Sequence, residues 1–127
     1  MNKIPFLAAI LAALGVGMGA FGAHALADTL EARGTTDTWE TAVFYHLIHA
    51  VTVWITCFCP ILTKTLNQRA ALCWLTGIIC FSGSLYGLSL GGPRWLGPIT
   101  PIGGILFIVG WIYAARIALA QARNESR

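Results

Sequence analysis

The stretch that decides the fold is residues 4–27, IPFLAAILAALGVGMGAFGAHALA, which carries no Lys, Arg, Asp or Glu. Within it, Gly17, Gly19 and Gly22 form the pattern G-x-G-x-x-G, which is typical of dinucleotide-binding turns. Such a turn needs a strand before it and a soluble helix after it, whereas this pattern lies inside a continuous apolar run. About 20 apolar residues are enough to cross a bilayer as a helix. We therefore interpret the glycines as a helix-packing surface and predict no nucleotide site.

The composition favours a membrane protein, because 57% of the 127 residues are hydrophobic and only 10% are charged. Soluble domains contain about 25% charged residues, so a water-soluble fold would lack side chains to cover its surface. The formal net charge of +3 is too small and too scattered for nucleic-acid binding. The expected partner is the lipid bilayer, a homo-oligomer or a membrane-protein partner is left open, and no nucleic acid is expected.

Four apolar runs predict an all-α integral membrane four-helix bundle, a single transmembrane domain of residues 1–127. The expected helices span residues 4–27, 38–63, 69–90 and 101–121, with short loops between them. Basic side chains gather at one end of this arrangement: Lys3, Lys64, Arg69, Arg116, Arg123 and Arg127. The other end has only Arg33 and Arg94, in company with several carboxylates. The positive-inside rule therefore predicts that both termini and the middle loop are cytoplasmic.

Local signals predict where the helices begin and bend. Asp37 and Glu40 fit a capping box with Asp37 as the N-cap residue, and Asn67 can cap the third helix. Pro60 predicts a kink or an early end of the second helix. Residues 23–25, Ala-His-Ala, imitate the cleavage site of a signal peptide, but the apolar run is longer than a signal core. We expect this segment to stay in the protein as a spanning helix.

Small and aromatic residues predict which positions pack and which anchor the helices. Small residues recur every three or four positions along the first helix: Ala8, Ala12, Gly15, Gly19 and Gly22. Gly83 and Gly87 repeat this arrangement in the third helix. Close backbone packing holds helices together in lipid, where burial gives no hydrophobic gain. We also expect interfacial anchoring by Trp39, Trp74 and Trp95, and packing by the deeper Trp54 and Trp111.

The second helix carries most of the polar side chains, with Tyr45, His46 and His49 at its centre. An ionisable residue inside a membrane is a functional hypothesis by default. The structural alternative is a neutral His49 that donates a hydrogen bond to a carbonyl or hydroxyl group of a neighbouring helix. The candidate ligand-binding residues in the outer half of the bundle are His24, Glu40, Tyr45, His46, His49, Ser82, Ser84, Tyr86 and Thr100.

The sequence gives little support for a metal site or for acid–base catalysis. The three histidines lie at different depths, so one ion held by all of them is not expected, and we predict no metal and no cofactor. The cysteines are interpreted as buried small hydrophobic residues: Cys57, Cys59, Cys73 and Cys80. No acidic residue lies in the membrane interior to pair with a histidine base. The sequence therefore gives no positive sign of an enzyme.

Four blocks of the sequence resemble the YgdD-like small membrane proteins, known as domain of unknown function 423, which include the eukaryotic transmembrane protein 256 group. The blocks are Gly19–His24, Trp39–Ala50, Phe81–Tyr86 and Leu96–Gly104, the last followed by Gly110-Trp111. The resemblance covers nearly the whole chain. It implies a four-helix integral membrane protein, located in the inner membrane in bacteria, and it implies no activity.

The same resemblance marks one departure. In the family, Gln often stands where this chain has His46, whereas His49 fits the pattern. This difference speaks against a metal site made by the two histidines, and it leaves His24 and His49 as the positions most worth testing.

These observations lead to a functional hypothesis. We expect a non-enzymatic, multi-pass protein of the bacterial inner membrane whose outer-half polar residues bind a small ligand, a lipid or a membrane partner. One alternative is a minimal transporter or proton-coupled channel that uses the polar stripe of the second helix. Another alternative is a metal- or haem-binding membrane protein.

Overall fold

The computed structural model describes residues 3–58 and 64–125, and within these ranges it contains helices and turns but no strand. The elements follow in this order: α1 (Ile4–Ala23), α2 (Ala27–Arg33), α3 (Thr36–Phe58), α4 (Lys64–Gly77), the π-helical turn η1 (Ile78–Ser82), α5 (Gly83–Ser89), the 3₁₀ turn η2 (Arg94–Leu96) and α6 (Ile99–Glu125). Four segments are long and apolar enough to span a membrane: Ile4–Ala23, Thr36–Phe58, Gln68–Ser89 and Arg94–Ala120. The predicted all-α, four-span membrane fold is confirmed.

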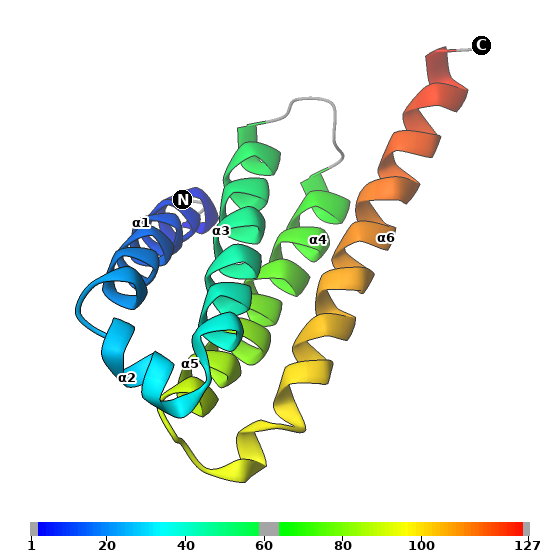
Figure 1. The fold of residues 1–127 in the computed structure, drawn as a ribbon. Coiled ribbons are helices and arrows are strands. Elements are labelled where there is room, and N and C mark those ends of the chain that lie inside the picture. The colour runs from blue at the N-terminus through cyan, green and yellow to red at the C-terminus, as the bar shows by residue number, and fades with distance from the viewer. Residues whose placement is uncertain (1–2, 59–63, 126–127) are drawn as a thin grey trace.

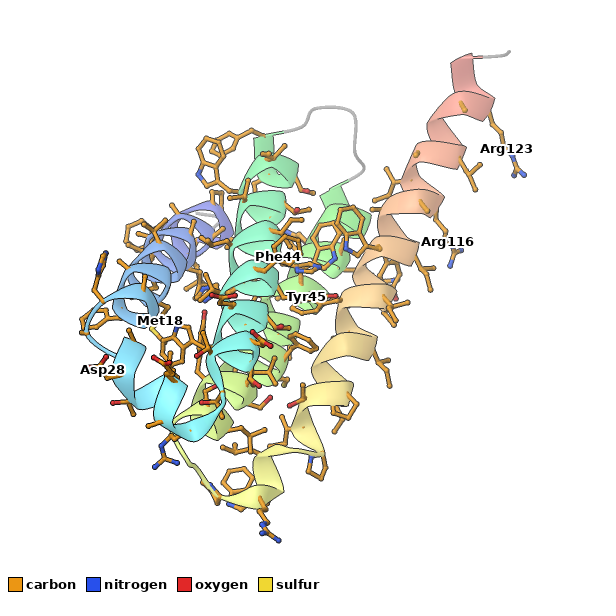
Figure 2. All side chains as sticks on the ribbon, in the orientation of Figure 1. Met18, Asp28, Phe44, Tyr45, Arg116 and Arg123 are labelled. Carbon is orange, nitrogen blue, oxygen red and sulfur yellow. The ribbon has the colours of Figure 1, made fainter. Side chains whose placement is uncertain are left out.

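The helices lie side by side, with α3 between α1 and the rest of the bundle. Helix α1 packs on one side of α3, the continuous α4–η1–α5 segment packs on the other, and α6 packs against α4 and η1 (Figure 1). The start of α1 and the end of α6 lie toward one end of the molecule, and α2 and η2 lie at the opposite end. The last turns of α6 extend beyond the other helices; Arg123 lies toward this end of α6, and Arg116 lies further back, beside the bundle (Figure 2). This arrangement leaves α1 with one main helix partner and two open sides.

The first helix is shorter than expected, because it ends at Ala23 and not at residue 27. The Leu26 N–H closes the end of α1 by donating to the Phe21 carbonyl at 2.8 Å. The next residues, expected to form a loop, form the short helix α2, which buries Leu30 to 1% exposure. Gly34, in the left-handed region with φ +64°, ends α2.

Two of the predicted helix caps are wrong. Helix α3 begins at Thr36, before the Asp37 of the predicted capping box. Thr35 precedes it, and the Thr35 hydroxyl donates to the Ser89 carbonyl of α5 at 2.9 Å, so a tertiary contact decides where α3 starts. Asn67 lies inside α4 and not at its start. Pro60 and Cys59 lie outside the described residues.

The apolar core lies between α3, α4 and α6, where buried alanines allow close packing around Trp74, Leu75, Ile78 and Phe107. Trp74 is only 1% exposed and is therefore a core residue, not the expected interfacial anchor. A Cβ atom at Gly110 would overlap the Trp74 indole, so this glycine makes room for the ring. Trp54 and Trp111, expected to be packing residues, are 45% and 47% exposed. Whether each tryptophan is buried therefore depends on which side of its helix faces the other helices.

Candidate functional site

Glycines of α1 form much of its contact with α3. A Cβ atom at Gly15 would lie 2.7 Å from Leu47 Cδ2, and one at Gly22 would overlap the Trp39 indole. Trp39 is 2% exposed, against the expectation of an interfacial anchor, and its Nε1–H donates to the Met18 carbonyl at 2.9 Å. These contacts are those of a helix-packing face at Gly15 and Gly22, whereas a Cβ atom at Gly17, the first glycine of the G-x-G-x-x-G pattern, would meet no atom within 4 Å.

The glycines expected to pack on the third span behave differently. A Cβ atom at Gly87 would lie 2.7 Å from Leu96 Cδ1, whereas one at Gly83 would meet no atom within 4 Å. Gly83 is exposed and makes no such close contact within the described chain, so the expectation for it is corrected. The close approach to α6 is instead made near Gly77 and Gly103, which pack on Phe107 and on Phe81.

Both ring nitrogens of His49 have partners, one within α3 and one on α6. Its Nδ1 lies 2.8 Å from the Tyr45 carbonyl, and the Trp111 Nε1–H donates to its Nε2 at 3.2 Å. A carbonyl only accepts and an indole N–H only donates, so these partners require the neutral tautomer with hydrogen on Nδ1. The imidazole also stacks on Phe107, with ring centres 3.7 Å apart and planes 9° apart. His49 is thus neutral and bonded to a neighbouring helix, but the direction differs from the expectation, because it donates within α3 and accepts from α6.

His46, one helical turn before His49, faces a different neighbour and pairs with Tyr86 of α5. Its Nδ1 is 3.2 Å from the Tyr86 hydroxyl oxygen, and the Tyr86 ring packs on Trp39 with ring centres 4.8 Å apart. His46 is only 5% exposed, and its Nε2 has no hydrogen-bond partner. The backbone of Leu11 in α1 lies near the His46 ring. His46 is thus a buried polar side chain with one nitrogen unsatisfied.

A groove of about 310 Å³ runs beside His46, between α1 and the η1–α5 segment. We call it the α1–α5 groove, and its lining residues are Leu11, Leu14, Met18, His46, Ile78, Ile79, Gly83 and Tyr86. Among the described residues, only His46 and Tyr86 bring polar side chains to its lining. Gly83 is also part of the lining, is exposed and has no side chain. Binding sites usually combine an apolar wall with a few placed polar groups; in this groove the wall is apolar, and the polar atoms of His46 and Tyr86 are covered.

Ser84 and Thr100 form a separate polar pair between α5 and α6, with hydroxyl oxygens 2.6 Å apart. The Ser84 hydroxyl also lies 2.9 Å from the Phe81 carbonyl, inside the π-helical turn. A π turn displaces the regular carbonyl partners of a helix, so Ser84 satisfies a carbonyl next to the irregularity. Ser82 is fully buried and its hydroxyl has no partner.

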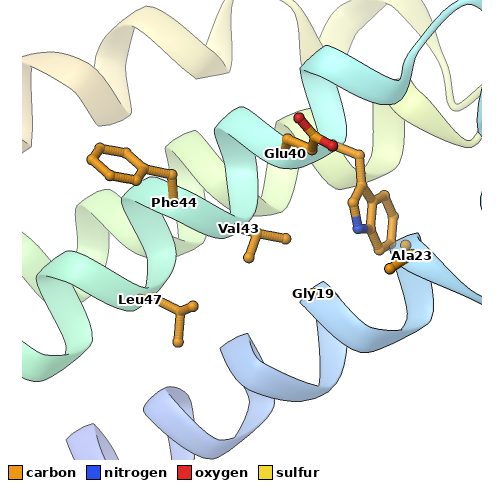
Figure 3. A pocket seen from close by; sticks show the side chains of 8 residues that line it. Gly19, Ala23, Glu40, Val43, Phe44 and Leu47 are labelled. Carbon is orange, nitrogen blue, oxygen red and sulfur yellow. The ribbon is translucent and has the colours of Figure 1, made fainter.

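The nine candidate residues therefore do not form one site. His24 is exposed at the end of α1, whereas Tyr86 pairs with His46. Glu40 lies on the other side of α1, where it lines a second groove together with Trp39 (Figure 3). Tyr45 and His49 face α6. Helix α3 turns its polar residues to several faces, which separates positions that are close in sequence.

Metal-binding groups are scattered in the same way. Among residues 3–58 and 64–125, no three His, Cys, Asp or Glu side chains lie close enough to share a metal ion. Cys57, Cys73 and Cys80 are free thiols and only partly buried, which corrects the expectation of full burial. Sequence reasoning also missed Trp111 and Phe107 as partners of His49, because they belong to another helix and share no sequence pattern with it.

Comparison with known proteins gives a consistent family. Residues 18–104 match the family model described as "Protein of unknown function (DUF423)". The chain is 42% identical over 114 residues to the UPF0382 membrane protein YwdK of Bacillus subtilis, covering 88% of this chain and 92% of the relative. It is 36% identical over 115 residues to a UPF0382 membrane protein of Haemophilus influenzae, covering 90% and 91%. No solved structure matches the chain.

A relative also exists in fission yeast. The UPF0382 membrane protein C1782.12c of Schizosaccharomyces pombe is 34% identical over 110 residues, covering 83% of this chain and 92% of the relative.

Proposed function

Because the chain belongs to the DUF423 family of membrane proteins, whose function is unknown, we propose a function from its geometry: it is a non-enzymatic protein that binds a membrane-soluble ligand in the α1–α5 groove. The observation that carries the proposal is the unpartnered Nε2 of His46, which is 95% buried beside this groove. An unsatisfied buried polar atom costs about 1–3 kcal/mol. A ligand whose entry uncovers this nitrogen and that then accepts a hydrogen bond from it would recover part of that free energy.

Hydrogen-bond accounting identifies the chemistry of the ligand. If the Tyr86 hydroxyl donates to His46 Nδ1, only one donor, the Nε2–H, is left without a partner. If Nδ1 donates instead, both the Tyr86 O–H and the Nε2 lone pair are left without one, so the first arrangement is favoured. The Nε2–H then offers a hydrogen bond to an acceptor oxygen. The ligand would have an apolar body and a carbonyl, ester or ether oxygen.

The family resemblance suggests a discriminating variant. A Gln side chain carries an N–H₂ donor as well as an acceptor, so Gln at position 46 keeps the N–H donor to which the ligand oxygen would bind. A Leu side chain has similar bulk and no donor. His46→Gln should therefore retain ligand binding, and His46→Leu should lose it.

The test uses the full-length protein in lipid nanodiscs and a fatty acyl methyl ester that carries a photoactivatable diazirine. The matched control probe is an alkane of the same length with the same diazirine and no ester. We expect the ester to label the lining of the α1–α5 groove several-fold more than the alkane, and His46→Leu to remove this difference. His24→Ala, at an exposed position outside the groove, is the matched protein control.

Equal labelling by the two probes would contradict the proposal. So would an unchanged preference in a His46→Leu variant that keeps the thermal stability of the wild type. The proton-coupled alternative gains no support from His49, because both of its ring nitrogens already have partners within the protein. The bacterial relatives support a location in a bacterial plasma membrane. The distribution of basic residues predicts that the α2 and η2 end faces outward.

A further inference from the structure

We infer a second binding site on the other side of α1, where Glu40 holds the ammonium group of an outer-leaflet lipid. The α1–α3 groove has a volume of about 310 Å³ and is lined by Gly19, Gly22, Ala23, Trp39, Glu40, Val43, Phe44 and Leu47. It shares no residue with the α1–α5 groove. Lipid binding in the α1–α3 groove can therefore be tested separately from ligand binding in the α1–α5 groove.

The shape of the groove suits an acyl chain. Val43 and Leu47 point from α3 toward α1, and Glu40 lies nearer the start of α3, on the same end of the molecule as α2 (Figure 3). On the α1 side the groove is lined by Gly19, Gly22 and Ala23, and the Trp39 indole lies over Gly22. All of its lining apart from Glu40 and the Trp39 indole N–H is apolar, and that N–H already binds the Met18 carbonyl.

The charge around the groove selects the headgroup. Residues 28–40 contain four carboxylates and one arginine, which are Asp28, Glu31, Asp37, Glu40 and Arg33. The Arg33 guanidinium lies over Gly91, at the end of α5. Glu40 is the only one of these carboxylates that lines the groove. An anionic headgroup would be repelled at this position, and a cation would be attracted.

A primary ammonium fits this site better than a quaternary one. Its N–H groups donate charge-assisted hydrogen bonds to a carboxylate, whereas a choline headgroup has no N–H to donate. An ammonium at the level of Glu40 places the acyl chains of the same lipid along the apolar part of the groove. The occupant that we assign is therefore an ethanolamine-headed phospholipid.

The experiment measures lipid retention in the full-length protein. The protein is placed in choline-lipid nanodiscs that contain a minor fraction of the ethanolamine lipid, and native mass spectrometry records the lipids that stay bound after release. We expect the ethanolamine lipid to be enriched over its share of the nanodisc. Glu40→Gln should reduce this enrichment about two- to fivefold, the range of an exposed ion pair.

The control is Asp37→Asn, which removes the same charge from a neighbouring exposed position outside the groove. It should leave the enrichment unchanged. Equal loss in both variants would show a general effect of surface charge and overturn the site, as would equal retention of choline and ethanolamine lipids. Both side chains are exposed, so neither substitution should unfold the protein. Thermal unfolding of each variant checks that the comparison is made on folded protein.

Discussion

Trp39 donates its indole N–H to the Met18 carbonyl of α1 at 2.9 Å, and its ring lies over the backbone of Gly22. The contact joins two helices by a hydrogen bond from a side chain to a helix backbone, which is reachable because Gly22 has no side chain. It also explains the last glycine of the G-x-G-x-x-G pattern. The nearby Gly17 is different, since a Cβ atom there would meet nothing within 4 Å.

This difference predicts opposite outcomes for two alanine substitutions. Gly22→Ala should lower the free energy of unfolding by about 1–3 kcal/mol, because the new methyl group overpacks the Trp39 contact. Gly17→Ala should leave it unchanged or raise it slightly, because alanine is the better helix former. Reversible unfolding in mixed detergent micelles measures both. Equal effects of the two substitutions would contradict this account of the packing face.

His49 is predicted to be the neutral tautomer with hydrogen on Nδ1. Nitrogen NMR of labelled protein should show a protonated Nδ1 and an unprotonated Nε2, because the Tyr45 carbonyl and the Trp111 indole impose these states. Trp111→Phe removes the second partner and should cost about 0.6 kcal/mol, the average for a hydrogen bond between membrane helices. A protonated Nε2 in the wild type would be inconsistent with the contacts that we describe.

Alanine substitutions at Gly34 and Gly91 distinguish the cost of backbone strain from the cost of a steric clash. Both have positive φ, +64° and +83°, but only Gly91 has a neighbour in the way, the Arg33 guanidinium. Gly34→Ala should therefore cost about 1–2 kcal/mol from strain alone, and Gly91→Ala should cost more. The same unfolding assay measures both.

The double variant Arg33→Ala with Gly91→Ala provides the control, because it removes the neighbour and should reduce the cost of the Gly91 change toward that of Gly34→Ala. If the excess cost persists without the Arg33 side chain, the contact is not its source.

The membrane orientation remains a prediction and can be tested with single cysteines in a variant that lacks the native ones. Glu31→Cys on α2 should react with an impermeant maleimide in intact bacterial cells, because the basic residues predict that this end is outside. Ala122→Cys near the end of α6 should react only after permeabilisation. Both positions are exposed in the structure. The reverse labelling pattern would show that the protein inserts the other way.

Much of the fold could be predicted because it depends on the length and apolarity of segments. The four spans and the membrane environment follow from runs that contain too few charges for water. The helix starts were harder, since the Thr35 hydroxyl meets the Ser89 carbonyl, 54 positions further along the chain. The candidate site was predicted in its residue types but not in its arrangement. His46 and His49 are one helical turn apart and yet face different neighbours.

The sequence by itself determined the solvent of this protein and the number of its spans, because lipid requires long apolar helices whatever their neighbours are. Only the tertiary structure decided which face of each helix is buried. In a bilayer the outward face is as apolar as the inward one, so the hydrophobic period that marks a buried face in water carries little information. The roles of Trp39, Trp74, His46 and His49 therefore came from helix rotation and from the π turn, which depend on contacts between distant segments.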